Sequence, residues 1–321
     1  MIIFLALLSV LLPVAYGSQG DSFAFFQDCA TFCRRDHDCP EFKFGYAWTT
    51  SPCFQCRQNC VFETVRTFEA YGWPIPQFFG KWPFASIAFD IGPLPIVIQE
   101  PASVVFSLLN LWAVTVLHQK INDDIDDDYR LKGVWLNYAR IGYLVWIASA
   151  VFHARDFWLT EYLDYFAACG VVFYAFFAAV SFTLPVLQSN IKAIKIWLTF
   201  AALLLGTYLF HVASLLLSMD YGHNMTLCIG LSIITAVIYT LWAVREILQG
   251  RNRPSITILF KILGVGLGAA LFEVLDFPPI FWTFDAHSLF HAATIPTPLL
   301  LAQFAIAEAD YEAKAKKHHA I

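Results

Sequence analysis

Five polar residues fall near the ends of three apolar segments of this chain. Ser149 and His153 stand four residues apart at the end of one segment, and His287 and His291 stand four apart at the start of another. Asp164 lies just inside a third segment. A spacing of four puts both members of a pair on one face of a helix. Ionisable groups inside a membrane usually face a cavity or each other, so these residues form a candidate functional site.

The three histidines indicate the chemistry of that site. Neutral imidazoles bind Zn²⁺ through nitrogen, and a site with three protein ligands leaves a fourth position for water, as in catalytic zinc sites. Zinc lowers the pKa of that water to ~7 and so provides hydroxide at neutral pH. We predict a zinc-dependent hydrolase with His153, His287 and His291 as metal ligands. Asp164 would move the proton from the water to the leaving group, and Ser149 would donate a hydrogen bond to the oxyanion.

Other polar residues of the apolar segments have simpler interpretations. His118 and His211 each stand alone, and a lone histidine in an apolar helix is usually a hydrogen-bonded core residue. Asp285 is interpreted as the N-cap of the last segment, with a contact to a metal-bound histidine as the alternative. Glu273 and Asp276 either line the cavity or cap the bundle, and they are left out of the ligand set.

The composition is that of a protein that crosses a membrane several times. Of the 321 residues, 58% are hydrophobic and 14% are charged, far below the ~25% charged residues of soluble domains, and the mean hydropathy is +0.59. Apolar stretches of roughly 20 residues match a bilayer core of ~30 Å when helical. We predict an all-α membrane protein with a seven-transmembrane-helix bundle. Its apolar segments lie at about 100–117, 134–153, 162–183, 193–217, 225–246, 256–277 and 285–306.

The N-terminal region predicts entry into the secretory pathway. Residues 1–17 are apolar and end with small residues at Ala15 and Gly17, which is typical of a signal peptide. An uncleaved first helix is the alternative, since no basic residue precedes the apolar run. Residues 18–99 are expected to form a luminal cysteine-rich region and, from Tyr71 onward, a connector that is too rich in proline and glycine for a membrane helix.

Six of the eight cysteines lie close together in that region: Cys29, Cys33, Cys39, Cys53, Cys56 and Cys60. An even number of cysteines behind a signal peptide predicts disulfides, with zinc bound by thiolates as the less favoured alternative. The six residues can pair in many ways, and the sequence does not select one. Cys169 and Cys228 lie in apolar segments and are expected to be buried free thiols.

Basic residues in the short loops predict the orientation, because cytosolic loops are enriched in lysine and arginine. We predict a catalytic bundle at 100–306 with its N-terminus luminal, followed by a cytosolic tail at 307–321. The acidic run at 122–128 is interpreted as a solvated loop rather than a calcium site. The Asn224 sequon falls on the luminal side, very close to the membrane. The basic residues of the predicted cytosolic loops are Lys120, Arg130, Lys132, Lys192, Lys195, Arg245, Arg251, Arg253, Lys314, Lys316 and Lys317, whereas the opposite loops carry Arg155 alone.

The order of the site residues resembles a known superfamily. A serine four residues before a histidine, an aspartate eleven residues after that histidine, and HxxxH in the last segment are similar to the CREST membrane hydrolases, which include the alkaline ceramidases and the adiponectin-receptor group. Further motifs resemble the post-GPI-attachment-to-proteins phospholipase family, the Per-type proteins. These motifs are "GSQGD", "PQFFGKWPF", "QEPAS", "VFHARD", "LDYF", "LDFPPIFW" and "DAHSLFH".

That resemblance implies a function. It implies a phospholipase A2-type hydrolase that removes the sn-2 acyl chain from the phosphatidylinositol of GPI-anchored proteins, in the endoplasmic reticulum or Golgi membrane. It also implies His153, His287 and His291 as zinc ligands, assisted by Ser149 and Asp164. A ceramidase-like amide hydrolase and a non-catalytic receptor or escort for lipid-anchored cargo are the alternatives. The sequence has no patch of basic and aromatic residues of the kind that binds nucleic acid, so no nucleic-acid partner is expected.

Overall fold

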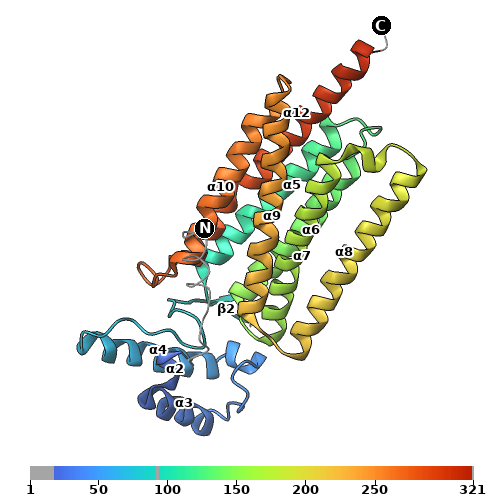
Figure 1. Ribbon diagram of the computed structural model, residues 1–321. Helices are drawn as coiled ribbons and strands as arrows, with labels where there is room; N and C mark the ends of the chain where they lie inside the picture. The colour runs from blue at the N-terminus through green and yellow to red at the C-terminus, as the bar shows by residue number, and fades with distance from the viewer. Residues whose placement is uncertain (1–17, 92–93, 320–321) are drawn as a thin grey trace, which may run out of the picture.

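A computed structural model describes residues 18–91 and 94–319, so the predicted signal peptide at 1–17 lies outside the described residues. The described chain is a bundle of long helices with the cysteine-rich region at one end and the C-terminus at the other (Figure 1). The bundle helices are α5 (Pro101–Asp124), α6 (Lys132–Ala154), α7 (Trp158–Thr183), α8 (Ile191–Leu217), α9 (Tyr221–Leu248), α10 (Ser255–Leu275), α11 (Ala286–Thr294) and α12 (Pro296–His319).

Six spans in the described part of the chain are long and apolar enough to cross a membrane: α5, α7, α8, α9, α10 and the continuous stretch Ala286–Ala315. The chain is a multi-pass all-α membrane protein, but the predicted count of seven such spans is too high by one. The exception is α6, which has 23 residues and packs between α5 and α7. It is less apolar because it carries polar side chains such as Asn137, Arg140 and His153.

The last predicted segment, at 285–306, is two helices. Its first part, α11, ends at Thr294, and α12 begins at Pro296 because prolines at 296 and 298 cannot donate the backbone hydrogen bonds that would continue one helix. The second part continues to His319, so most of the tail predicted at 307–321 is helical. This short α11 carries His287 and His291.

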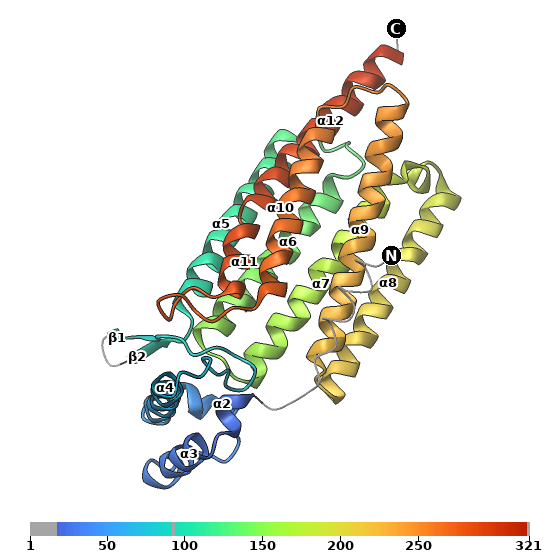
Figure 2. The ribbon, with the colours of Figure 1, turned by 60° about the vertical axis from the view of Figure 1, so that its left-hand side comes forward.

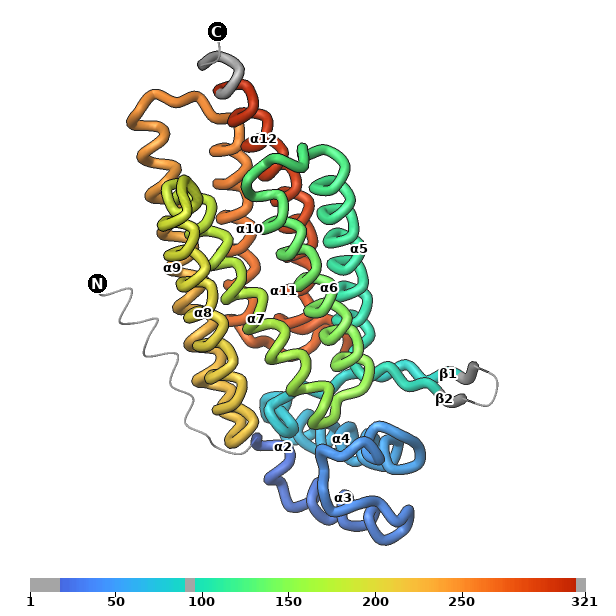
Figure 3. The backbone as a smooth tube through the Cα atoms, turned by 90° about the vertical axis from the view of Figure 1, so that its right-hand side faces the viewer, coloured from blue at the N-terminus to red at the C-terminus, as the bar shows by residue number. Residues whose placement is uncertain are grey.

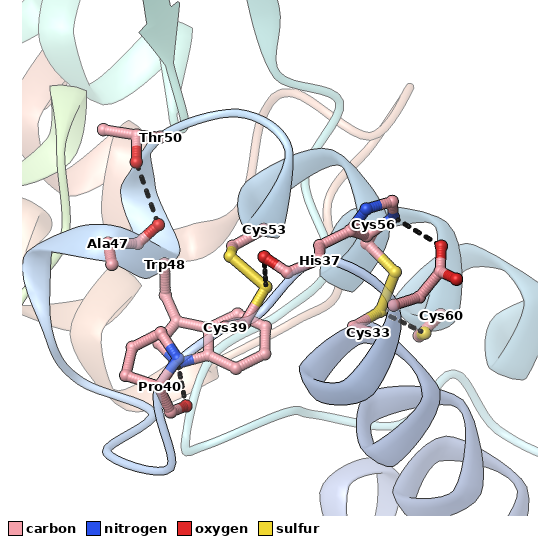
Figure 4. Close-up of a disulfide and its surroundings, with 11 residues drawn as sticks. Cys33, His37, Cys39, Pro40, Ala47, Trp48, Thr50, Cys53, Cys56 and Cys60 are labelled. Atoms are coloured by element: carbon pink, nitrogen blue, oxygen red, sulfur yellow. Dashed lines mark hydrogen bonds and ion pairs between the residues drawn. A yellow bond between two sulfur atoms is a disulfide. The ribbon is translucent and has the colours of Figure 1, made fainter.

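The cysteine-rich region is held together by three disulfides. It contains α2 (Gln19–Ser22), α3 (Ala24–Asp36), the 3₁₀ helix η1 (Tyr46–Thr49) and α4 (Cys53–Ala70). The bridges are Cys29–Cys60, Cys33–Cys56 and Cys39–Cys53, and Figure 4 shows the last two. Cys29 and Cys33 are four positions apart on α3, and their partners Cys60 and Cys56 are four positions apart on α4, in the opposite order along the chain. The two helices are therefore antiparallel, and the first two bridges join one face of α3 to one face of α4. Disulfides are confirmed, and no thiolate of the six is available for zinc.

A two-stranded sheet connects this region to the bundle, and the sequence interpretation missed it. Strands β1 (Ile87–Ile91) and β2 (Leu94–Ile98) pair antiparallel, with Ile87 opposite Ile98 and Ile91 opposite Leu94. The hairpin projects sideways between the cysteine-rich region and the bundle (Figure 3). Glu100 and α5 follow directly after β2, so this hairpin fixes where the first bundle helix begins.

Several smaller expectations are met. Cys169 is buried, Cys228 is partly buried, and neither forms a disulfide. His211 is a buried core residue whose Nε2 donates to Asn224 Oδ1 at 2.9 Å, and His118 Nδ1 lies 3.4 Å from Tyr143 Oη. Asp127 in the acidic loop is exposed and pairs with Lys132 at 2.7 Å.

The end of the bundle opposite the cysteine-rich region holds a buried ionic cluster. Glu246 and Glu308 are each 1% exposed. Arg253 reaches both, with Nε 2.7 Å from Glu246 and Nη1 2.5 Å from Glu308, and thereby joins α9 to α12. Arg251 pairs with Glu246 at 2.9 Å from a more exposed position.

Removal of Arg253 should therefore lower the free energy of unfolding more than removal of Arg251 does. Arg253→Met leaves two buried carboxylates without their shared cation, so we expect a loss of about 3–5 kcal/mol in the free energy of unfolding. Arg251→Met is the matched control and should cost about 1 kcal/mol or less, because this pair is partly solvated. Thermal denaturation of the purified protein in detergent would measure both, and equal small effects would contradict a structural role for the cluster.

Asn224 should carry no glycan. It lies in the first turns of α9, its side chain is buried, and its Oδ1 is held by His211. An acceptor asparagine must instead be accessible on a surface loop. Treatment with a peptide-N-glycosidase should leave the gel mobility of the wild-type protein unchanged and equal to that of Asn224→Gln. A mobility shift in the wild type alone would contradict this prediction.

Candidate metal centre

The three predicted histidine ligands lie together at the cysteine-rich end of the bundle. His153 comes from the last turn of α6, and His287 and His291 come from α11, which packs between α5 and α10 (Figure 2). One ring nitrogen of each lies within 4.8 Å of the others, and the Nε2 atoms of His287 and His291 are 3.0 Å apart. Asp285 caps α11 by accepting from the backbone N–H of Ser288 at 2.8 Å, as predicted, and so sets where this helix begins.

Each imidazole is anchored through its Nδ1 atom. His153 Nδ1 lies 2.5 Å from Glu100 Oε2, and His287 Nδ1 lies 2.7 Å from Glu273 Oε1. An ionised carboxylate only accepts hydrogen bonds, so both Nδ1 atoms carry the proton. The network therefore assigns the Nε2 lone pairs of His153 and His287 to the space between the rings.

The third histidine is anchored by a hydroxyl. His291 Nδ1 lies 3.1 Å from Ser107 Oγ, and that hydroxyl donates its single proton to the carbonyl oxygen of Ser103 at 2.7 Å. Ser107 must then accept from His291, so His291 also carries its proton on Nδ1. All three Nε2 lone pairs thus face one another.

This arrangement fits a zinc ion. His153 Nε2 is buried and has no hydrogen-bond partner among the described residues. Three imidazole lone pairs that face each other repel unless a cation or a proton lies between them, and histidines with Nδ1–H bound to carboxylate are the usual ligands of zinc. His153 and His291 are buried, whereas the side chain of His287 is 40% exposed, so the centre is accessible past His287.

The two predicted assisting residues occupy different positions. Asp164 on α7 is buried and lies within electrostatic range of His153 and His287. Ser149 Oγ is instead 3.0 Å from Ser107 Oγ, behind His291. Asp164 thus interacts electrostatically with two of the histidines, and Ser149 belongs to the hydrogen-bond network that supports the third.

Three anchoring residues were missed from the sequence. Glu100 directly precedes Pro101, so it looked like an ordinary residue at a helix start, and Ser107 looked like a small residue of an apolar helix. Glu273 was noticed at the correct end of its segment but was not assigned to His287. Its neighbour Asp276 has another role, because it accepts from Trp82 Nε1 at 2.8 Å and from Gln77 Nε2 at 3.0 Å in the connector.

The charge of Glu100 is maintained by a cation from the connector. Its Oε1 lies 3.0 Å from Lys81 Nζ, which also lies 2.7 Å from Asp156. Burial alone would raise the pKa of Glu100, but the charge of Lys81 and the hydrogen bonds from Lys81 and His153 hold that pKa below its usual range. Glu100 therefore remains a carboxylate that accepts from His153.

Comparison with known proteins identifies the family of this chain. The profile of the Per1-like family matches residues 44–309. The chain is similar to the "GPI-specific phospholipase A2-like PGAP3" of Cricetulus griseus (31% identity, 94% of this chain and 92% of the relative) and of Danio rerio (32%, 94% and 94%). It is also similar to the "Post-GPI attachment to proteins factor 3" of Drosophila melanogaster (32%, 90% and 89%). No solved structure matches it. The chain belongs to the Per1-like family.

Proposed function

We propose that this protein is a zinc-dependent phospholipase that removes the sn-2 acyl chain from the phosphatidylinositol of GPI-anchored proteins. The observation that carries the proposal is the convergence of three imidazole Nε2 atoms, each with its Nδ1 atom anchored. The names of the relatives supply the substrate class. Six apolar spans support a substrate that is itself held in a membrane.

His153, His287 and His291 would hold the ion, and Glu100 and Glu273 would keep two of their rings in the correct orientation. Zinc at such a site acts as a Lewis acid and lowers the pKa of water to about 7. The anchoring carboxylates also raise the basicity of the two imidazoles, which strengthens their binding to a cation.

Asp164 would perform the proton transfers. Ester hydrolysis forms a bond between the water oxygen and the acyl carbon and breaks the bond between that carbon and the glycerol oxygen. The proton leaves the water and ends on the glycerol hydroxyl, and a buried carboxylate within electrostatic range of the histidines could carry it. Ser149 would donate to the oxyanion once its hydroxyl, which donates to Ser107 in this structure, rotates away from that partner.

The topology proposed with this function places the centre in the lumen of the endoplasmic reticulum or Golgi and the C-terminus in the cytosol. Three disulfides at the same end as the histidines support an oxidising compartment. The basic residues of the opposite end support the cytosol there. They include Lys120, Arg130, Lys192, Lys195, Arg251 and Arg253.

Loss of Asp164 should abolish hydrolysis while the metal stays bound. We expect Asp164→Asn to lower the release of fatty acid from a defined GPI lipid by at least about 10²-fold, since a general acid–base typically contributes 10²–10⁴-fold. The purified full-length protein would be assayed in detergent, with a chelator-treated sample beside it. Asp127→Asn, in the exposed loop, is the matched control and should retain full activity.

Three results would count against the proposed reaction. Release of acid from the sn-1 position would contradict the regiochemistry, and cleavage of ceramide instead of the ester would indicate an amide hydrolase. Metal binding without release of acid from any ester or amide lipid, with function in cells retained by Asp164→Asn, would favour an escort protein.

Zinc content gives an independent test of the ligand set. We expect about one zinc per chain in the wild type and much less in His287→Ala and in His291→Ala. Glu273→Leu removes the anchor of His287 and should weaken zinc affinity roughly 10–100-fold. The control is His118→Ala, because His118 lies outside the centre. Elemental analysis after dialysis would measure each, and full zinc occupancy in both histidine variants would exclude these ligands.

A further inference from the structure

A polar cavity lies between the cysteine-rich region and the bundle, next to the metal centre. Its volume is about 110 Å³, and it is lined by α4, by the connector and by the turn between α6 and α7. The charged and amide residues that line it are Lys43, Arg57, Lys81, Gln99, Glu100, Asp156 and Glu161 among others. None of these except Glu100 and Lys81 has a role in the metal centre described above.

Arg57 contributes donors that find no acceptor in the part of the chain that the structure describes. Its Nη1 donates to the carbonyl oxygen of Lys43 at a long 3.4 Å, and its guanidinium lies 5.7 Å from the ring of Trp48. No described carboxylate lies within ion-pair distance of it, in contrast to Lys81, which contacts Glu100 and Asp156. A guanidinium has five N–H donors in a planar fork that matches a phosphate group, so most of the hydrogen-bonding capacity of Arg57 is available to a ligand.

Gln99 contributes a second unused donor. Its Oε1 accepts from the backbone N–H of Asp156 at 2.8 Å, which fixes the side-chain amide. Its Nε2 has no hydrogen-bond partner among the described residues, although the residue is only 9% exposed. A buried amide donor without an acceptor is costly, so a ligand oxygen at this position would be stabilising.

The remaining walls suit a sugar. The carboxylate of Glu161 and that of Asp156 can accept hydrogen bonds from hydroxyl groups, and aromatic rings of Phe44, Phe79 and Trp82 cover other parts of the wall. Donors for an anion, acceptors for hydroxyls and apolar faces for ring carbons together describe a phosphorylated polyol. A simple inorganic anion would use only the donors.

Glu100 connects this cavity to the metal centre. One of its oxygens bonds His153 and the other bonds Lys81, and the residue lines the cavity. A lipid with its headgroup in the cavity would therefore bring the ester nearest to that headgroup toward the histidines. This order of groups is that of a glycerophospholipid, in which the phosphate and the sn-2 ester are on adjacent carbons.

We propose that the cavity binds the phosphorylated sugar headgroup of the lipid substrate, with Arg57 and Lys43 on the phosphate and Gln99 on a sugar oxygen. The proposal rests on the proposed function for the identity of the lipid. Arg57 and Gln99 are substrate-binding residues in this account, and they determine specificity for a sugar-phosphate headgroup.

Binding of soluble headgroups tests the proposal without catalysis. Full-length Asp164→Asn in detergent would be titrated with glucosaminyl-inositol phosphate, myo-inositol 1-phosphate, myo-inositol and inorganic phosphate, by calorimetry. We expect the two sugar phosphates to bind, and Arg57→Gln to weaken binding at least about tenfold, the effect of one lost charge-assisted hydrogen bond. Gln99→Glu should weaken binding by a similar factor, because a carboxylate cannot donate to the sugar oxygen and repels the phosphate. Arg66→Gln, on the exposed side of the same helix, is the matched control and should bind like the parent.

Kinetics on the intact lipid give the second test. With the other residues unchanged, Arg57→Gln should raise KM for the GPI lipid at least about tenfold and leave kcat within about twofold, because the arginine binds the phosphate and takes no part in cleavage of the ester. Arg57→Lys should restore only part of the loss, since an ammonium lacks the planar fork. Thermal midpoints and disulfide content equal to wild type would show that the variants are folded.

The possible failures are distinguishable. Hydrolysis of the GPI lipid with unchanged KM in Arg57→Gln, or binding of inorganic phosphate as tightly as the sugar phosphates, would overturn the headgroup site and leave the proposed function standing. Binding of the sugar phosphates through Arg57 by a protein that hydrolyses no lipid would support the headgroup site and overturn the proposed function.

Discussion

The carboxylate of Glu100 is the group on which the arrangement of the metal centre depends. It is buried, and its two oxygens are shared between His153 of the bundle and Lys81 of the connector. Its backbone N–H also donates to the carbonyl oxygen of His153 at 3.0 Å. A buried carboxylate that lost one of these partners would be strongly destabilising. The orientation of a predicted metal ligand is therefore tied to the placement of a segment outside the bundle.

The cysteine-rich region makes that placement possible. A segment of this size buries too little apolar surface to be stable alone, and disulfides compensate by restricting the unfolded chain. From this stapled core, Gly20 donates to Gln77, and Asp21 accepts from the backbone of Phe79. The connector is thereby held in position on both sides of Lys81, since Trp82 reaches Asp276 on the bundle.

The sequence predicted those features that depend on short spacings. HxxxH on a capped helix, a paired set of six cysteines and long apolar segments are all local patterns, and the structure contains each of them. The sequence did not reveal Glu100 as the partner of His153, because the two residues are 53 positions apart and meet only after the hairpin folds back. The error in span number has a separate cause, since Asn137, Arg140 and His153 all lower the hydropathy of α6 and only His153 belongs to the centre.

One remaining pattern was local and could have been recognised. Because Pro296 has no N–H, the backbone N–H of Ile295 turns to Ala292, and the carbonyl of His291 loses its helical partner. Asn110 Nδ2 of α5 donates to that carbonyl at 2.7 Å, one turn from Ser107, which holds the ring. Polar residues at 103, 107 and 110 lie on one face of an otherwise apolar helix. Two of them contact His291, with Ser107 at its imidazole and Asn110 at its carbonyl. A polar stripe on a membrane helix therefore indicates a partner with several groups to satisfy, here a ligand at a helix break.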